Sequence, residues 1–180
     1  MKGYAGKILH VNLSSGHFEV ENPEESFYRT YLGGSCIGTY YLLKRMKAGI
    51  DPLASESVLV FSVGPIAGSR ISGAARHAVT GKSPQTGGIM ASEAGGYWAP
   101  EFKKAGFDAL VISGRAERPV YLWIHDGQYE LRDASDLWGK TTGQVQQIIR
   151  DEYGDQKIRI AQIGPSGENL CNYANIVNEL

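Results

Sequence analysis

The sequence contains two copies of one order of predicted elements. Residues 8–20 and 120–131 alternate apolar and polar side chains around a Ser-Gly and an Asp-Gly turn, which is typical of β-hairpins. Each hairpin is followed by helical periodicity and then by a β-rich run that ends in Gly-Pro, at 58–65 and 158–165. A duplicated hairpin–helix–strand unit accounts for this order, although such hairpins and turns are common enough for chance to produce it.

The segments between hairpin and strand differ in length. In the first copy, 24–31 and 36–47 both have helical periodicity, and a Gly-Gly pair separates them. In the second copy, Thr141 or Thr142 is placed to cap a single helix. The pattern therefore predicts an α+β fold, with two pseudo-symmetric halves whose connecting helices have diverged.

The two halves span about 1–115 and 116–180. A glycine-rich segment, a short helix and a buried strand follow the first Gly-Pro, but little sequence follows the second. If the halves match, the second is truncated and lacks its counterpart of residues 82–113. We therefore expect the core to be completed by other domains or subunits.

The segment Arg76–Gly96 is rich in glycine and holds the pairs Gly87-Gly88 and Gly95-Gly96. Glycine permits positive φ and removes the side chain that keeps a ligand away from backbone N–H and C=O groups. The pattern indicates close approach of the backbone to a bound group, with an anionic cofactor as the first candidate. Within it, 82–84 read equally well as a phosphate-binding loop or as an exposed turn.

Composition restricts the classes of partner. The chain has 180 residues, 42% of them hydrophobic, which suits one domain or two small packed halves. Its net charge of −1, without runs of like charge, argues against nucleic acid and acidic membranes as partners. No apolar run approaches the ~18 residues that span a bilayer, and the start lacks the pattern of a signal peptide. We expect a cytoplasmic protein.

The cysteines, Cys36 and Cys171, are far apart and show no C-x-x-C spacing. They cannot assemble an iron–sulfur or zinc site from this chain, and we expect them to be buried thiols. The four histidines show no metal-ligand spacing either.

Seven motifs along the whole chain resemble the N-terminal domain of the tungsten-dependent aldehyde ferredoxin oxidoreductases. In order they are MKGYAGKILHVNLSSG at the start, VGP at 63–65, KSPQTG at 82–87, ASEAGGYW at 91–98, KAGFDAL at 104–110, LRDASDLWGK at 131–140 and IGPSGENL at 163–170. Each motif alone is weak, whereas seven in the right order make the resemblance specific.

The resemblance implies that residues 1–180 form a pterin-binding domain, whose mixed β-sheets make a base under a bis-pterin cofactor of tungsten or molybdenum. It implies an enzyme that oxidises aldehydes to carboxylates with water as oxygen source and passes electrons through a 4Fe–4S cluster to ferredoxin. The cluster cysteines would belong to further, mostly helical domains outside this chain, which alone would be inactive. A homodimer is compatible with the family, and no catalytic residue can be assigned within this chain.

Five positions correspond by motif to cofactor-binding residues of the family. Arg76 matches an arginine between pterin and cluster, where a planar guanidinium can donate several hydrogen bonds; a surface ion pair is the structural alternative. Glu93 matches a residue, often Asn, whose backbone carbonyl binds a magnesium ion that bridges the pterin phosphates. Ala94, Gly95 and Gly96 match the turn that brings backbone amides to the pterin, and a simple helix-entry turn is compatible with that role.

The predicted repeat adds an expectation of its own. If Glu93 supplies one carbonyl to a metal between two equivalent pterins, the second half should supply another, near or beyond Asn178–Leu180. A rival interpretation is a non-catalytic interaction or assembly subunit that has kept the fold without a working cofactor site.

Overall fold

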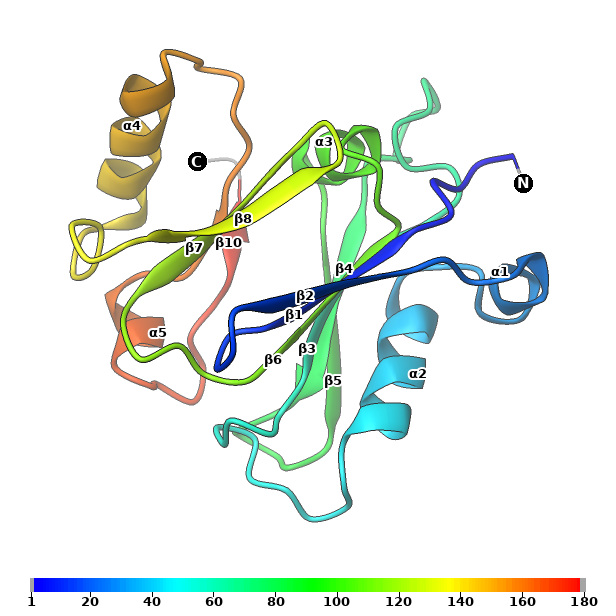
Figure 1. Cartoon of the computed structure of the whole chain (residues 1–180), viewed down its shortest axis with the longest axis horizontal. Coiled ribbons are helices and arrows are strands. Elements are labelled where there is room, and N and C mark those ends of the chain that lie inside the picture. The colour runs from blue at the N-terminus through cyan, green and yellow to red at the C-terminus, as the bar shows by residue number, and fades with distance from the viewer. Residues whose placement is uncertain (1, 179–180) are drawn as a thin grey trace.

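Residues 2–178 are described in a computed structural model, and a six-stranded sheet is their central element (Figure 1). Its strands lie in the order β2-β1-β6-β3-β4-β5. Only β1 and β6 run parallel among its neighbouring pairs, so the sheet is mixed, and the predicted α+β class is confirmed. The strands are β1 (Ile8–Asn12), β2 (His17–Glu21), β3 (Leu59–Val63), β4 (His77–Lys82), β5 (Ile89–Ala94) and β6 (Ala109–Ser113).

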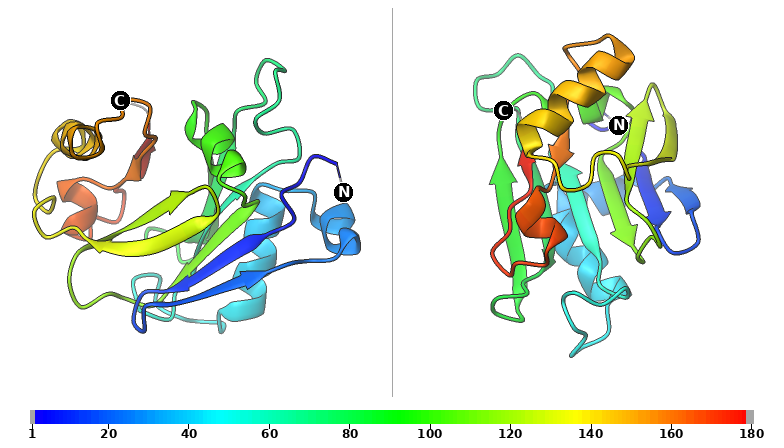
Figure 2. Two further views of the ribbon diagram at one scale, coloured as in Figure 1. Left: turned by 45° about the horizontal axis from the view of Figure 1, so that its top comes forward. Right: turned by 90° about the vertical axis from the view of Figure 1, so that its left-hand side faces the viewer.

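Two helices, α1 (Glu25–Tyr31) and α2 (Ser35–Arg45), lie on one face of this sheet. The other face is covered by α3 (Trp98–Lys104) and by the C-terminal part of the chain (Figure 2). The C-terminal part consists of the hairpin β7 (Val120–His125) and β8 (Gln128–Asp133), α4 (Thr142–Tyr153), β9 (Ala161–Gln162), α5 (Pro165–Glu168) and β10 (Val177–Asn178).

Alternation along the central strands divides the core into two clusters. In β3, Val60 packs among the side chains from α1 and α2, whereas Phe61 points to the opposite cluster with α3. In β6, Val111 and Leu110 make the same division. Successive side chains of a strand point to opposite faces, so the central strands are buried on both sides and the sheet becomes the middle layer of the fold.

Most of the predicted elements are present, with shorter boundaries in places. Both hairpins form, and Thr141 caps α4 in a capping box with Gln144. The run at 158–165 is strand only over β9, which pairs with β10. The prediction that both cysteines are buried is wrong, because Cys36 is exposed and Cys171 is half-buried. No helix within residues 2–178 is both long and apolar enough to span a membrane.

The glycine-rich segment has more regular structure than its composition suggested. Most of it forms the hairpin β4–β5 at the outer edge of the sheet, and 83–88 are the connecting turn. Lys82 donates its ammonium group to the carbonyl of Ile50, so it braces the neighbouring loop. The contacts thus favour an exposed structural turn over a phosphate-binding loop.

Candidate functional site

The five predicted residues gather at one end of the β4–β5 hairpin. Glu93 and Ala94 are the last residues of β5, and Gly95 and Gly96 follow directly. The register pairs His77, the first residue of β4, with Ala94, so Arg76 and Gly95 are the residues next to this last pair. All of them are exposed except the half-buried Ala94. The hairpin therefore brings together residues separated by up to twenty positions in the sequence.

The hydrogen-bond pattern leaves part of the β5 backbone pointing away from β4. In an antiparallel pair, positions whose N–H and C=O groups face each other alternate with positions whose groups point outward. The Ser83–Gly88 pair is bonded, because the Ser83 amide donates to the Gly88 carbonyl at 2.8 Å. The Ala78–Glu93 pair lies an odd number of register steps from the Ser83–Gly88 pair. The backbone N–H and C=O groups of Ala78 and Glu93 therefore point away from each other.

Glu93 thus directs both its amide N–H and its carbonyl oxygen to the free edge of the sheet. No strand of residues 2–178 pairs with that side of β5. An edge with alternating donors and acceptors can bind an anion through N–H groups and a hard cation through carbonyl oxygens. This is the chemistry that a phosphate bridged by magnesium requires.

The turn after β5 needs glycine. Gly96 has φ of +91°, a conformation that other residues rarely adopt. If Gly95 carried a Cβ atom, its nearest neighbour among the described residues would be the Ala75 carbonyl oxygen at 3.9 Å. A side chain would therefore fit at this position. Within the described residues, glycine is thus required by the backbone conformation at Gly96 and not by crowding at Gly95.

The Glu93 side chain lies on the same face of the sheet as α2. Thr80 and Ala78 face that helix, as shown by the close approach of Gly38 to Thr80 and of Gly34 to Ala78. Glu93 pairs with Ala78 and so shares its face. Its carboxylate has no ion-pair partner among residues 2–178.

Arg76 also has no ion-pair partner among the described residues, so the surface-ion-pair interpretation of this arginine gains no support. Nor does any group of three or more His, Cys, Asp or Glu side chains in this part of the chain have an arrangement that could hold a metal. A metal at this edge would need backbone oxygens or ligands from another part of the protein.

The C-terminal part of the chain contacts this turn at two points that sequence reasoning missed. The Asn178 side-chain amide of β10 donates to the Gly95 carbonyl at 3.0 Å, across 83 positions of sequence. The Arg159 guanidinium lies 4.7 Å from the ring centroid of Tyr97, within the range of a cation–π contact. The place expected for a second metal-binding carbonyl, near or beyond Asn178–Leu180, is described only as far as Asn178, and Glu179 and Leu180 lie outside the described residues.

His77 lies beneath the site on the opposite face of the sheet. It is buried, its ring centroid is 4.7 Å from that of Trp98, and its Nδ1 has no hydrogen-bond partner. Burial lowers the pKa of the imidazole from its ordinary value. The ring is thus a neutral packing group that supports the start of β4, next to Arg76.

The lowered pKa of His77 predicts acid-sensitive folding. The imidazole of the unfolded chain binds a proton near pH 6.5, whereas the buried imidazole binds it only at lower pH. The contribution of His77 to the free energy of unfolding is therefore fully present above about pH 6.5 and decreases as the pH falls below that value. His77→Phe should reduce the loss of unfolding free energy between about pH 7.5 and 5.5, where one such group contributes at most about 1.4 kcal/mol per pH unit. Denaturant titrations at each pH measure it, with exposed His17→Phe as the control. An unchanged slope in His77→Phe would contradict the assignment.

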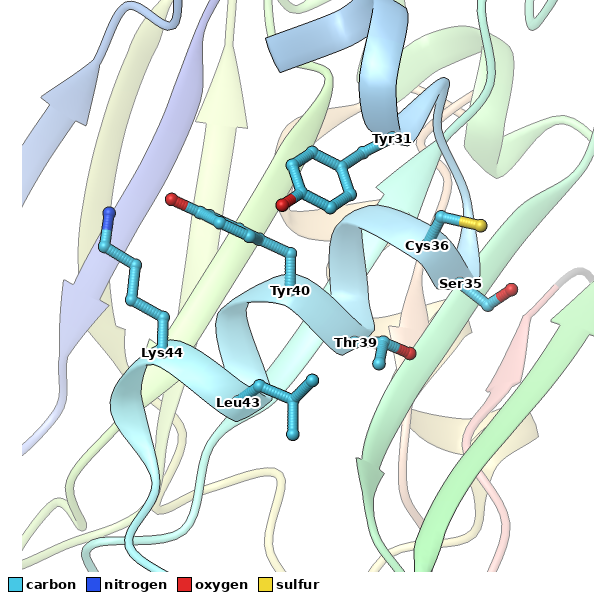
Figure 3. A pocket seen from close by; sticks show the side chains of 7 residues that line it. All are labelled: Tyr31, Ser35, Cys36, Thr39, Tyr40, Leu43 and Lys44. Carbon is cyan, nitrogen blue, oxygen red and sulfur yellow. The ribbon is translucent and has the colours of Figure 1, made fainter.

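A separate groove of about 600 Å³ lies beside α1 and α2 (Figure 3). It contains none of the five predicted residues, and its wall is mainly apolar and aromatic. The lining residues are Tyr31, Ser35, Cys36, Thr39, Tyr40, Leu43 and Lys44. The groove therefore offers a surface for contact and no group of side chains to which we assign chemistry.

The chain is similar to a known protein family. Residues 8–180 match the family described as "Aldehyde ferredoxin oxidoreductase, N-terminal domain". The chain therefore belongs to this family of oxidoreductase domains.

Its relatives are longer proteins. The chain is 44% identical over 178 residues to a "Tungsten-containing aldehyde ferredoxin oxidoreductase" of Pyrococcus abyssi, an alignment that covers 99% of this chain and 29% of the relative. It is 30% identical over 195 residues to an "Aliphatic sulfonate oxidoreductase, WOR-like subunit" of Pyrococcus furiosus, covering 100% of this chain and 31% of that protein.

A solved structure has the same fold. It is the "Active site complex BamBC of Benzoyl Coenzyme A reductase in complex with 1,5 Dienoyl-CoA", with a TM-score of 0.95 and 34% identity. The match covers 98% of this chain and 27% of the solved chain. The chain thus spans less than a third of each of these relatives.

Proposed function

We propose that this chain is the pterin-binding domain of an oxidoreductase that carries a tungsten or molybdenum bis-pterin cofactor and oxidises aldehydes to carboxylates. The observation that carries the proposal is the convergence of Arg76, Glu93 and the Gly95-Gly96 turn at one end of the β4–β5 hairpin. Relatives with tungsten in their names match the chain from end to end. In this proposal the domain binds and orients the cofactor, and the metal of the bound cofactor supplies the redox chemistry.

Each residue has a role that its geometry permits. The exposed Arg76 guanidinium can donate several hydrogen bonds to pterin or phosphate oxygens. The outward carbonyl of Glu93 can bind a magnesium ion, which prefers oxygen ligands and phosphates. The exposed Gly95 has an amide that can donate to an anionic oxygen, and Ala94 and Gly96 hold the backbone on either side of it.

The Glu93 carboxylate places a negative charge close to the proposed phosphates. Because its side chain lies on the α2 face, it can remain in solvent while its backbone carbonyl serves the metal at the edge. The two roles are geometrically separable, since the carbonyl lies in the plane of the sheet and the side chain points out of it.

The rest of the protein would supply what this domain lacks. We propose further domains or subunits that contribute the 4Fe–4S cluster and its cysteines, with ferredoxin as the electron acceptor. The C-terminal part exposes several large apolar side chains that such domains would cover. They are Trp138, Ile163, Leu170 and Tyr173.

We also propose that residues 116–178 are an incomplete second copy of the first half. In both parts a hairpin is followed by a helix, a strand with Gly-Pro after it, and an antiparallel partner strand. The Asn178–Gly95 hydrogen bond supports the expectation that the second copy reaches the metal-binding edge of the first. In this arrangement the two sheets form the base of the cofactor site.

Replacing Arg76 tests the proposal. In the full-length protein purified with its cofactor, Arg76→Ala should weaken cofactor binding by about ten- to a hundredfold, because charge-assisted hydrogen bonds are lost. The readouts are tungsten, molybdenum and pterin per chain after extended dialysis, together with aldehyde oxidation. Arg76→Lys keeps the charge without the planar fork and should have an intermediate effect.

Arg70→Ala is the matched control, because Arg70 is also exposed and precedes the same hairpin. Finding neither tungsten nor molybdenum in the wild-type protein would reject the proposal. If the metals are present but Arg76→Ala matches Arg70→Ala in cofactor content and activity, the domain is better described as an interaction or assembly module.

A further inference from the structure

We infer that Asn178 is a positioning residue of this site, which fixes the turn at Gly95 and leaves the Glu93 carbonyl as the acceptor that binds a cation at the edge of β5. The inference rests on the proposed function for the identity of the cation, magnesium. The contact itself is seen in the structure: the Asn178 Nδ2 atom is 3.0 Å from the Gly95 carbonyl oxygen.

Two carbonyl oxygens at the end of β5 nearest the turn are candidates for the same role. That of Glu93 points away from β4, and that of Gly95, just past the end of β5, is directed to Asn178 of β10. An unpaired carbonyl oxygen beside a phosphate is unfavourable, because both groups are hydrogen-bond acceptors. The Asn178 amide satisfies the Gly95 oxygen, so one carbonyl is paired within the protein and the other stays free for a metal.

A second contact from the same ribbon supports the turn on its other side. Arg159, just before β9, stacks its guanidinium on the exposed ring of Tyr97, directly after Gly96. Asn178 belongs to β10, which pairs with β9. The β9–β10 ribbon therefore holds the residues before and after Gly96.

This brace acts on two successive glycines, Gly95 and Gly96. Two successive glycines lose more conformational entropy on ordering than other residues do. Contacts on both sides of them reduce the number of conformations that the turn can adopt before a cofactor binds. The chain positions that supply these contacts lie more than sixty residues from the turn, so the site needs both parts of the chain.

Asn178→Asp isolates the hydrogen bond from the packing. Aspartate has nearly the same shape, but its ionised carboxylate has no donor and would face the Gly95 oxygen as a second acceptor. Asn178→Ala removes the group altogether. Asn172→Ala is the control, because Asn172 is exposed in the loop before β10 and makes no described side-chain hydrogen bond.

The experiment uses the full-length protein purified with its cofactor and has two readouts. Hydrogen–deuterium exchange of residues 92–98 should be about five- to tenfold faster in Asn178→Asp and Asn178→Ala than in Asn172→Ala. The ratio of magnesium to tungsten after dialysis should fall several-fold in the same two variants. A merely structural loss would lower both metals together and leave the ratio unchanged.

Exchange or a metal ratio equal to that of Asn172→Ala in both variants would overturn the inference. A wild-type protein without tungsten, molybdenum or pterin would instead reject the proposed function, and the exchange comparison would still decide whether Asn178 braces the turn. The two failures are therefore distinguishable.

Discussion

Asp108→Ala should lower the free energy of unfolding by about 3–5 kcal/mol, the usual cost of removing one partner from a buried ion pair. The Asp108 side chain is 0% exposed, and it accepts from the Lys103 ammonium at 2.6 Å. It also accepts from the backbone amides of Ala5 at 3.0 Å and Gly6 at 2.7 Å. Alanine would leave the two amides without their acceptor and the nearly buried ammonium without its carboxylate partner.

The same carboxylate connects the N-terminal segment, α3 and β6. Lys103 lies on α3 and also donates to the Gly64 carbonyl at 3.3 Å, after β3. Since α3 begins two residues after Gly96, its displacement would reach the candidate site. We therefore expect loss of Asp108 to reduce cofactor retention as a consequence of the lost stability.

Chemical denaturation of the purified protein measures the effect. Asp108→Asn keeps the shape and one acceptor oxygen, so its loss should be smaller than that of Asp108→Ala. The control is Glu101→Ala, which breaks the exposed Glu101–Lys104 pair and should cost no more than about 1 kcal/mol. Equal losses in Asp108→Ala and Glu101→Ala would show that the buried pair contributes little.

Local signals were sufficient to predict much of the fold. The hairpins follow from alternation around Ser-Gly and Asp-Gly turns, and the start of α4 follows from the cap at Thr141. These features depend on residues a few positions apart. The whole-chain resemblance is confirmed by the family match over residues 8–180.

The strand β5 could not be read in the same way. Its sequence, IMASEA, contains residues with low strand propensity and no apolar alternation. Pairing with β4 determines its conformation, and as an edge strand it has little burial to impose a pattern. The segment therefore resembled a glycine-rich loop, although most of it is a hairpin.

The residues of the candidate site also differ in how far the sequence alone could predict them. Motif resemblance was sufficient to select Arg76, Glu93 and the following turn, and the register of the hairpin then brings them together. The partners Asn178 and Arg159 lie 83 and 62 positions from the residues they contact, so no local pattern could reveal them. The orientation of the Glu93 carbonyl depends on hydrogen-bond parity, which sequence alone does not determine.

Gly38→Ala should destabilise the protein by about 1–3 kcal/mol through overpacking between α2 and β4. A Cβ atom at Gly38 would lie 2.2 Å from Oγ1 and 2.5 Å from Cβ of the buried Thr80. Alanine normally favours a helix over glycine by about 1 kcal/mol, so a loss of stability would show that the clash outweighs helix propensity. Because Ala78 is on the same strand face as Thr80, a displaced α2 would also disturb the neighbourhood of Glu93.

Gly143→Ala is the matched control within a helix, because a Cβ atom there would meet nothing within 4 Å. It should stabilise the protein by about 0.4–1 kcal/mol, the usual gain from replacing a helical glycine without strain. The double variant Gly38→Ala with Thr80→Gly removes the opposing Cβ, so its loss should be smaller than the sum of the two single losses. Denaturant unfolding measures the free energy of unfolding of each variant. If the losses of the two single variants simply add in the double variant, Gly38 and Thr80 do not interact as closely as described.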